Sequence, residues 1–192
     1  MKVIEDTYFD ESVDGFVPIV PGIYPAHVSK LETISFDSGS TVFNVTFRLS
    51  EECKKINVNK MISDGDGGYM EAQDDEGNPI TIDCGYLKDR DVRSQGVWLT
   101  PKPKEGEGWR NRNYLEFFES LGVEFKRNDQ QKVVLAEVEE EDIIGIPTQV
   151  KVGEETYKKD GEDRKTMRVF TCHTWSNGKR RNADEFDDDI PF

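Results

Sequence analysis

The chain has 192 residues and a formal net charge of −14, with 35% hydrophobic and 33% charged residues. This length predicts one domain with decorations, or at most two small ones, and the hydrophobic share suffices for a buried core. Five carboxylates fall within the last ten residues, yet the remainder is still acidic without them. The charge therefore counts against strong non-specific binding of duplex DNA and leaves room only for a local basic groove.

The first part of the chain predicts an arm followed by a β-hairpin. Residues 1–21 are acidic and interrupted by prolines, as is typical of an arm that leads into a domain. Residues 22–34 predict a first strand, and 37–40 (DSGS) predict a turn. Residues 41–49 (TVFNVTFRL) alternate apolar and polar side chains, which predicts a second, half-buried strand.

The middle of the chain is less regular. Residues 56–62 predict a third short strand, and 63–79, rich in Gly and Asp, predict a mobile loop. Residues 96–99 (GVWL) are compatible with a strand. Asn113 is the predicted cap of one clear helix, because apolar residues follow it at helical spacing and Gly122 comes directly after them.

The last part of the body predicts two more strands joined by a tight turn. They cover residues 143–152 and 166–175, with a Lys-Lys-Asp-Gly turn between them. About five strands, with one helix between the third and the fourth, predict a mainly β domain of the OB-fold type, a five-stranded closed barrel over residues 22–177. Residues 178–192 predict a disordered acidic tail.

The end of the chain combines acidic and apolar residues. Asp187, Asp188 and Asp189 precede Ile190, Pro191 and Phe192. An acidic solubilising tail gains nothing from an exposed apolar end, whereas one pocket with a basic rim would accept both the ring and the terminal carboxylate. These six residues resemble the acidic tip (DDDIPF) of the bacterial single-stranded-DNA-binding protein family, and Phe186 extends the match. The resemblance implies docking onto replication, recombination and repair enzymes, with Pro191 and Phe192 as the main anchors.

The body resembles the single-stranded-DNA-binding OB proteins of bacteriophages. The resemblance rests on Gly22-Ile23-Tyr24, Leu121-Gly122 and Ile144-Gly145, with Tyr157 downstream. It implies a non-enzymatic protein that coats single-stranded DNA without a cofactor. The expected setting is a phage-infected bacterial cytoplasm. The long Gly/Gln/Pro-rich linker of the bacterial family is not present in this chain.

Single-stranded DNA binding requires a basic groove and aromatic side chains on which bases stack. The stretch 98–112 (WLTPKPKEGEGWRNR) supplies both, and its prolines and glycines predict an exposed loop. Its candidate contacts are Trp98, Lys102, Lys104, Trp109, Arg110 and Arg112. Further candidates are Arg48, Lys54, Lys55 and Lys60, and at a hairpin tip Tyr157, Lys158, Lys159, Arg164 and Lys165. The alternatives are that both Trp pack in the core and that each cation is merely solvated.

Catalysis and metal binding have little support in the sequence. No phosphate loop or nucleophile motif is present, and three widely spaced cysteines predict reduced thiols rather than a zinc site or disulfides. The Asp64–Gly68 stretch lacks the twelve-residue calcium pattern. No apolar run approaches the length that crosses a membrane.

The acidity of the body leaves one other function open. The chain would then be an acidic adaptor or decoy that occupies host enzymes through its tip and does not bind DNA itself. In the DNA-binding interpretation, the acidic run near a basic groove would compete with phosphate.

Overall fold

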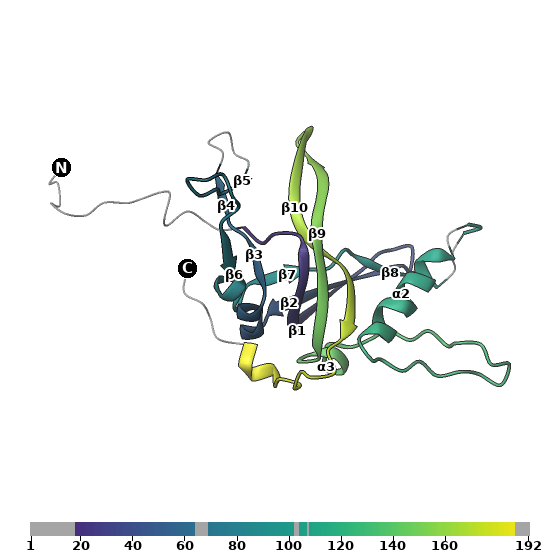
Figure 1. The fold of residues 1–192 in the computed structure, drawn as a ribbon. Helices are drawn as coiled ribbons and strands as arrows, with labels where there is room; N and C mark the ends of the chain where they lie inside the picture. The colour runs from purple at the N-terminus through teal and green to yellow at the C-terminus, as the bar shows by residue number, and fades with distance from the viewer. Residues whose placement is uncertain (1–17, 64–68, 102–103, 107, 187–192) are drawn as a thin grey trace, which may run out of the picture.

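The structure is a computed structural model that describes residues 18–63, 69–101, 104–106 and 108–186. It is mainly β with one main helix (Figure 1), which confirms the predicted class. The strands are β1 (Gly22–Ser35), β2 (Thr41–Leu49), β3 (Asn57–Asn59), β4 (Met61–Ser63), β5 (Tyr69–Glu71), β6 (Thr81–Asp83), β7 (Asp91–Arg93), β8 (Val97–Leu99), β9 (Pro147–Lys159) and β10 (Glu162–Thr174). The helices are α2 (Trp109–Ser120), α3 (Glu140–Ile143) and the 3₁₀ turns η1 (Glu51–Lys55), η2 (Cys84–Leu87) and η3 (Ala183–Phe186).

The largest sheet joins strands from both ends of the chain. Its order is β10-β9-β1-β2-β7, with β8 also paired to β2, and all of these pairs are antiparallel. The first half of β1 pairs with β9 and its second half with β2. A register shift between Val28 and Lys30 lies on the β2 side of this strand, and such bulges bend a strand and increase its twist.

The two edges of this sheet meet at one point. Ser94, directly after β7, forms an isolated parallel bridge with Val169 of β10, and the Gln95 amide donates to the Val169 carbonyl at 3.3 Å. Among the described residues no continuous ladder joins the two edges. The sheet is therefore not closed into a barrel, and the prediction of a closed five-stranded barrel is wrong in this respect.

The core lies on one face of β2, where the predicted alternation is confirmed. Phe43, Val45, Phe47 and Leu49 on this face are at most 1% exposed. Tyr114 and Phe118 of α2 pack on Phe43, with ring centroids 5.1 and 5.7 Å apart. The opposite face of β2 is also largely covered, since Thr46 is buried there, so the strand is more than half-buried.

Helix α2 begins earlier than the sequence predicts. Its first residue is Trp109, and Gly108 precedes it without a side-chain capping hydrogen bond. Asn113 therefore lies inside the helix and is not its cap. Gly122 follows the helix at φ +87°, a conformation that favours glycine, so the predicted end is confirmed.

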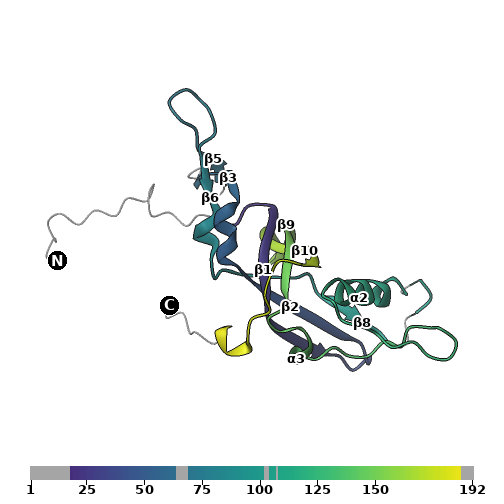
Figure 2. The ribbon, with the colours of Figure 1, turned by 60° about the horizontal axis from the view of Figure 1, so that its bottom comes forward.

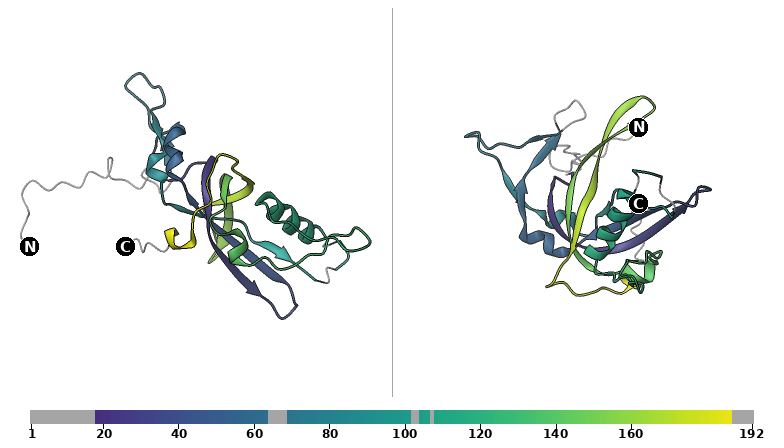
Figure 3. Two further views of the ribbon diagram at one scale, coloured as in Figure 1. Left: turned by 90° about the horizontal axis from the view of Figure 1, so that it is seen from below. Right: turned by 90° about the vertical axis from the view of Figure 1, so that its right-hand side faces the viewer.

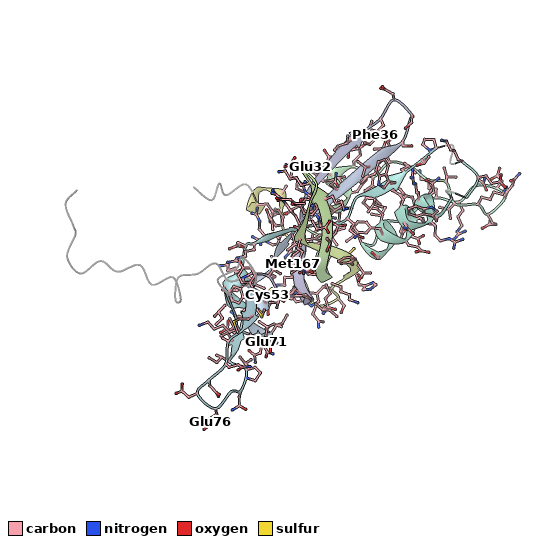
Figure 4. All side chains as sticks on the ribbon, turned by 90° about the horizontal axis from the view of Figure 1, so that it is seen from above. Glu32, Phe36, Cys53, Glu71, Glu76 and Met167 are labelled. Carbon is pink, nitrogen blue, oxygen red and sulfur yellow. The ribbon has the colours of Figure 1, made fainter. Side chains whose placement is uncertain are left out.

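Residues 56–63 and 69–83, here called the arm and distinct from the predicted N-terminal arm, project from the body (Figure 2). The predicted third strand is split at Lys60 into β3, which pairs with β6, and β4, which pairs with β5. The Lys60 amide donates to the Ile80 carbonyl, and its own carbonyl accepts from Ala72. β5 lies within the predicted loop, whose residues 64–68 fall outside the described part. Figure 4 shows Glu71 and Glu76 along the arm.

Strands β9 and β10 form a long hairpin. Lys159 pairs with Glu162 across Asp160 and Gly161, whose φ angles are +55° and +85°. Two left-handed residues are the requirement of the tightest hairpin turn, so the predicted turn is confirmed. β9 begins at Pro147 rather than at Ile143, because residues 140–143 form α3.

Residues 178–186, here called the strap, lie against the body. The sequence predicts a disordered tail from residue 178, whereas these nine residues are ordered. The Arg181 amide donates to the Gly145 carbonyl at 3.0 Å, and His27 Nε2 donates to the Lys179 carbonyl at 3.1 Å. The Arg180 guanidinium donates to the carbonyls at the end of α3, including that of Ile144 at 2.9 Å. The strap ends at Phe186, which is only 9% exposed.

The three cysteines are free and buried. Burial raises the pKa of Cys53 to about 12 and that of Cys172 to about 11, so both are protonated and unreactive near neutral pH. Within the described residues no group of His, Cys, Asp or Glu could hold a metal ion. None of the described helices has the length and apolar character needed to cross a membrane.

Candidate nucleic-acid interface

The outer face of the large sheet, opposite the core, carries a group of aromatic side chains. Side chains alternate between the two faces of a strand, so Val42 points outward where Phe43 points into the core. Trp98 of β8 pairs with Val42 and shares its face. Phe36 lies in the turn at the far end of the β1–β2 hairpin (Figure 4).

Three rings and one guanidinium form a continuous stack that runs from Phe36 through Trp98 to the start of α2. Phe36 and Trp98 are stacked, with ring centroids 5.3 Å apart and an interplanar angle of 22°. The Arg110 guanidinium lies 5.6 Å from the ring of Trp98 and 5.6 Å from that of Trp109. We call these four residues the aromatic row. Trp109 is 55% exposed, so the alternative that both Trp lie in the core is wrong for Trp109.

A cavity of about 420 Å³ opens beside the aromatic row, between β8, α2 and β10. Trp98, Trp109 and Arg110 line one side, and Phe170 to His173 line the other. This volume falls within the usual range for ligand sites, about 300–1,000 Å³. We call the cavity and the aromatic row together the groove.

Phe170 reaches the groove because of a bulge in β10. The register with β9 shifts between Val169 and Thr171, so Phe170 is an extra residue without its own partner. A Cβ on Gly153 would lie 2.9 Å from the Phe170 ring, which shows that the ring covers this glycine. The bulge leaves Phe170 42% exposed, directed away from the core.

Asn111 holds the start of α2 against the end of β8. Its side-chain oxygen accepts from the Thr100 amide at 2.8 Å, and its side-chain nitrogen donates to the Thr100 carbonyl at 2.9 Å. These two bonds fix the spacing between Trp98 and Trp109, which lie two residues before Thr100 and two residues before Asn111, respectively.

We expect Asn111→Ala to lower the free energy of unfolding by about 1–3 kcal/mol, because two hydrogen bonds are lost together. Asn113→Ala is the matched control, since Asn113 is exposed in the same helix. We expect that change to cost less than about 0.5 kcal/mol. Urea denaturation of both variants measures the difference. A loss of about 1 kcal/mol at Asn113 would instead identify it as the helix cap and contradict the structure.

The β9–β10 hairpin extends the face that carries Phe170. Glu155 of β9 accepts from Arg168 of β10 at 3.2 Å and from Gln95 beside the groove at 3.0 Å. Tyr157 lies two residues after Glu155 and pairs with Arg164, so these two share this face. The predicted contacts Tyr157, Lys159 and Arg164 therefore lie on the face continuous with the groove. The predicted contacts Lys158 and Lys165 lie on the other, where Lys165 pairs with Glu154 at 2.9 Å.

Three predicted cations are not brought to the groove. Lys54 pairs with Glu51 at 2.6 Å within η1, and this carboxylate raises the pKa of Lys54. Lys55 pairs with Glu52 in the same turn. Lys60 is half-buried in the arm. Lys54 and Lys55 therefore belong to the surface of η1, and Lys60 belongs to the arm.

Arg48 points outward as predicted but has other partners. Its guanidinium forms two bonds with Asp91, at 3.0 and 3.2 Å, and donates to the Phe186 carbonyl at 3.0 Å. The Phe186 ring lies 5.7 Å from this guanidinium and 4.8 Å from that of Arg181. The structure therefore assigns Arg48 to anchoring the strap. Phe186, predicted as part of the partner-binding tip, is buried by the same contacts.

Some predicted residues lie outside the described part of the chain. These are Lys102 and the tip residues Asp187, Asp188, Asp189, Ile190, Pro191 and Phe192. Lys104 is described and exposed in the loop before α2, and Arg112 is exposed on the helix. Both remain available to a ligand that follows the aromatic row.

Comparison with known proteins does not identify a family or a function for this chain. A scan of protein-family models finds no match to the chain, and no curated protein matches its sequence. Sequence reasoning missed Phe36 and Phe170. Phe36 directly precedes the predicted Asp-Ser-Gly-Ser turn, and this position could have identified it as a surface aromatic residue. The bulge that exposes Phe170 has no signal in the local sequence.

Proposed function

We propose that the chain binds single-stranded DNA in the groove and coats it without catalysing a reaction. The observation that carries this proposal is the aromatic row, in which two rings flank an arginine and a third ring extends the stack. Exposed rings and guanidinium groups offer stacking surfaces to unpaired bases of any sequence. A duplex keeps its bases stacked inside and offers none of these faces.

We also infer that the body is an OB-like domain with an open seam. β1 pairs with both β2 and β9, α2 precedes β9, and β10 approaches β7 in parallel. OB-folds bind nucleic acid on the face of their second and third strands and on the loops that join strands one to two and four to five. Phe36 lies in the connection between β1 and β2, Trp98 lies on β8, which pairs with β2, and Tyr157 lies near the end of β9; these positions support both inferences.

We expect affinity for a single-stranded oligonucleotide of about thirty bases to exceed that for the matching duplex by at least tenfold. Affinity should fall as salt rises, because each phosphate contact releases counterions. Fluorescence anisotropy with both labelled DNAs at two salt concentrations measures this. Equal affinity for the two forms would refute groove binding.

The second part of the proposal concerns the tip. We propose that Asp187 to Phe192 recruits replication, recombination and repair enzymes, and that the protein acts in a phage-infected bacterial cell. The six residues that resemble the bacterial family's tip support this. In surface plasmon resonance with purified bacterial repair enzymes, Phe192→Ala should remove most of the binding, since a buried aromatic concentrates the energy of such contacts. Binding unaffected by Phe192→Ala would contradict this part alone.

The adaptor function remains a second candidate because many cations near the groove are already paired. Arg164 lies 3.7 Å from Glu162, and Arg168 pairs with Glu155. In an adaptor, the tip would bind enzymes while the body showed no affinity for either form of DNA. The oligonucleotide experiment distinguishes the two candidates.

A further inference from the structure

One carboxylate connects the β9–β10 hairpin to the lining of the groove. Glu155 of β9 accepts a hydrogen bond from the Gln95 side chain at 3.0 Å through one oxygen and from Arg168 Nε at 3.2 Å through the other. Gln95 lines the groove, and Arg168 lies two residues before Phe170 on β10. Glu155 therefore holds the Arg168 guanidinium beside the groove. Arg168 is not among the contacts predicted from the sequence.

The contact with Glu155 uses only one of the three nitrogens of the Arg168 guanidinium. Within the described part of the chain, the two terminal nitrogens make no hydrogen bond. The side chain is 30% exposed, so it is within reach of a ligand at the surface. A guanidinium that is held through Nε still presents the planar pair of terminal N–H groups that matches the oxygens of a phosphate.

Exposed rings lie on both sides of this guanidinium. Arg168 pairs with Gly153, and the Phe170 ring covers the position of a Cβ on Gly153, so Phe170 and Arg168 are neighbours on the outer face. Tyr157 lies on the same face, four residues after Gly153, which corresponds to about 13 Å of strand. Glu155 is midway between them and draws the guanidinium between the two rings. Figure 3 shows that this hairpin extends beyond the rest of the large sheet.

The spacing of these groups suits a single strand that leaves the groove along the hairpin. Phe170 and Tyr157 are 42% and 41% exposed, so each offers a surface on which a base can stack. The backbone that joins two such bases passes Arg168. Proteins that bind unpaired strands combine aromatic surfaces for the bases with cations that follow the phosphates, and this face of the hairpin contains both.

We propose that Arg168 binds a phosphate of the DNA strand and that Glu155 is the residue that positions it. The terminal nitrogens of Arg168 take the phosphate, while Glu155 keeps the guanidinium between the two rings. The inference rests on the proposed binding of single-stranded DNA and extends that site from the groove onto the hairpin.

Replacing Arg168 tests the phosphate contact. We expect Arg168→Gln to weaken binding of an oligonucleotide of about thirty bases by about tenfold at low salt. The slope of log K against log[salt] should become shallower by about 0.7, the value for one phosphate contact on a single strand. Arg168→Lys should keep the slope but bind less tightly than the unchanged protein, because an ammonium group lacks the planar fork. Lys165→Gln is the matched control, since Lys165 lies on the opposite face and pairs with Glu154 at 2.9 Å.

Replacing Glu155 tests the positioning role, and the expected sign is opposite to that of simple electrostatics. Removing a carboxylate near DNA ordinarily strengthens binding. A glutamine, however, has one acceptor oxygen where Glu155 uses two, and its amide N–H would face another donor. Glu155→Gln should therefore weaken binding by about two- to fivefold, although the net charge becomes less negative. Glu154→Gln removes the same charge from the opposite face and should not weaken binding.

Fluorescence anisotropy over a range of salt concentrations measures these affinities, and thermal melting checks that each variant is folded. Adding Glu155→Gln to Arg168→Gln should cause no further loss, because Glu155 acts through Arg168. A further loss would show that it acts through Gln95 and would overturn its positioning role. If the unchanged protein binds the oligonucleotide, the inference is overturned by an unchanged salt slope in Arg168→Gln or by tighter binding in Glu155→Gln. No binding by the unchanged protein would refute the proposed function itself, and this inference with it.

Discussion

Replacing Trp109 by alanine is expected to weaken binding of a single-stranded oligonucleotide by about 1–3 kcal/mol, or about 5- to 150-fold. The ring is 55% exposed and stacks on the Arg110 guanidinium, so its removal takes away a platform for a base. Because Trp109 lies on the surface with more than half of its area exposed, the free energy of unfolding should change by less than about 0.5 kcal/mol. Fluorescence anisotropy gives the affinity, and thermal melting gives the stability.

Tyr69→Ala is the matched control for this experiment. Tyr69 is 46% exposed on the arm, so the change removes a comparable ring from a surface outside the groove. We expect its affinity for the oligonucleotide to equal that of the unchanged protein. If Trp109→Ala and Tyr69→Ala bind equally well, the aromatic row does not bind bases. A Trp109→Ala variant that melts much lower would instead give the ring a structural role.

Gly145→Ala is expected to release the strap. Gly145 has a φ of +75°, and a Cβ there would lie 1.8 Å from the Arg181 carbonyl oxygen. Left-handed strain alone costs about 1–2 kcal/mol, but the collision also forces Arg181 away and breaks its hydrogen bond to Gly145. Phe186 then loses the nearer of the two guanidinium groups that lie over its ring. We expect trypsin to cleave after Lys179 to Arg181 at least tenfold faster than in the unchanged protein.

Gly39→Ala separates the backbone strain from the collision. Gly39 has a φ of +78°, similar to that of Gly145, but no atom lies within 4 Å of the position of its Cβ. This variant should lose stability through strain and leave the rate of cleavage in the strap unchanged. Equal cleavage rates in the two glycine variants would show that contact with Gly145 does not hold the strap.

The elements that local sequence predicts correctly are those fixed by near neighbours. The alternation in β2 identifies its core face, because a period of two requires only the strand itself. Asp160 and Gly161 predict their turn in the same way, since their left-handed conformations depend on residue type. Trp109 and Arg110 were identified as candidate contacts because the loop before them has too many prolines and glycines for a buried segment.

The features that sequence did not predict depend on contacts between distant residues. Asn111 fixes the start of α2 by bonding to Thr100 across a loop, so the helix needs no capping residue. The sequence predicts Arg48 as a DNA contact, but its guanidinium binds the carbonyl of Phe186, which lies 138 residues away in the chain. The bulge at Phe170 arises from the register between two strands, which neither strand specifies alone.

The single bridge between Ser94 and Val169 has a consequence for base selection. Trp98 of β8 and Trp109 of α2 lie on one side of the groove and Phe170 of β10 on the other, and β8 and β10 belong to opposite edges of the sheet. These sides are tied at this bridge, by the hydrogen bond from Gln95 to Glu155 at 3.0 Å and by the contact between Ser120 and Cys172 at 3.3 Å, with no ladder in the described residues between them. The width of the groove therefore depends on few contacts between the two edges of the sheet. If the groove binds single-stranded DNA as proposed, its rings stack on purines and pyrimidines alike, and we expect the affinity to depend little on base composition.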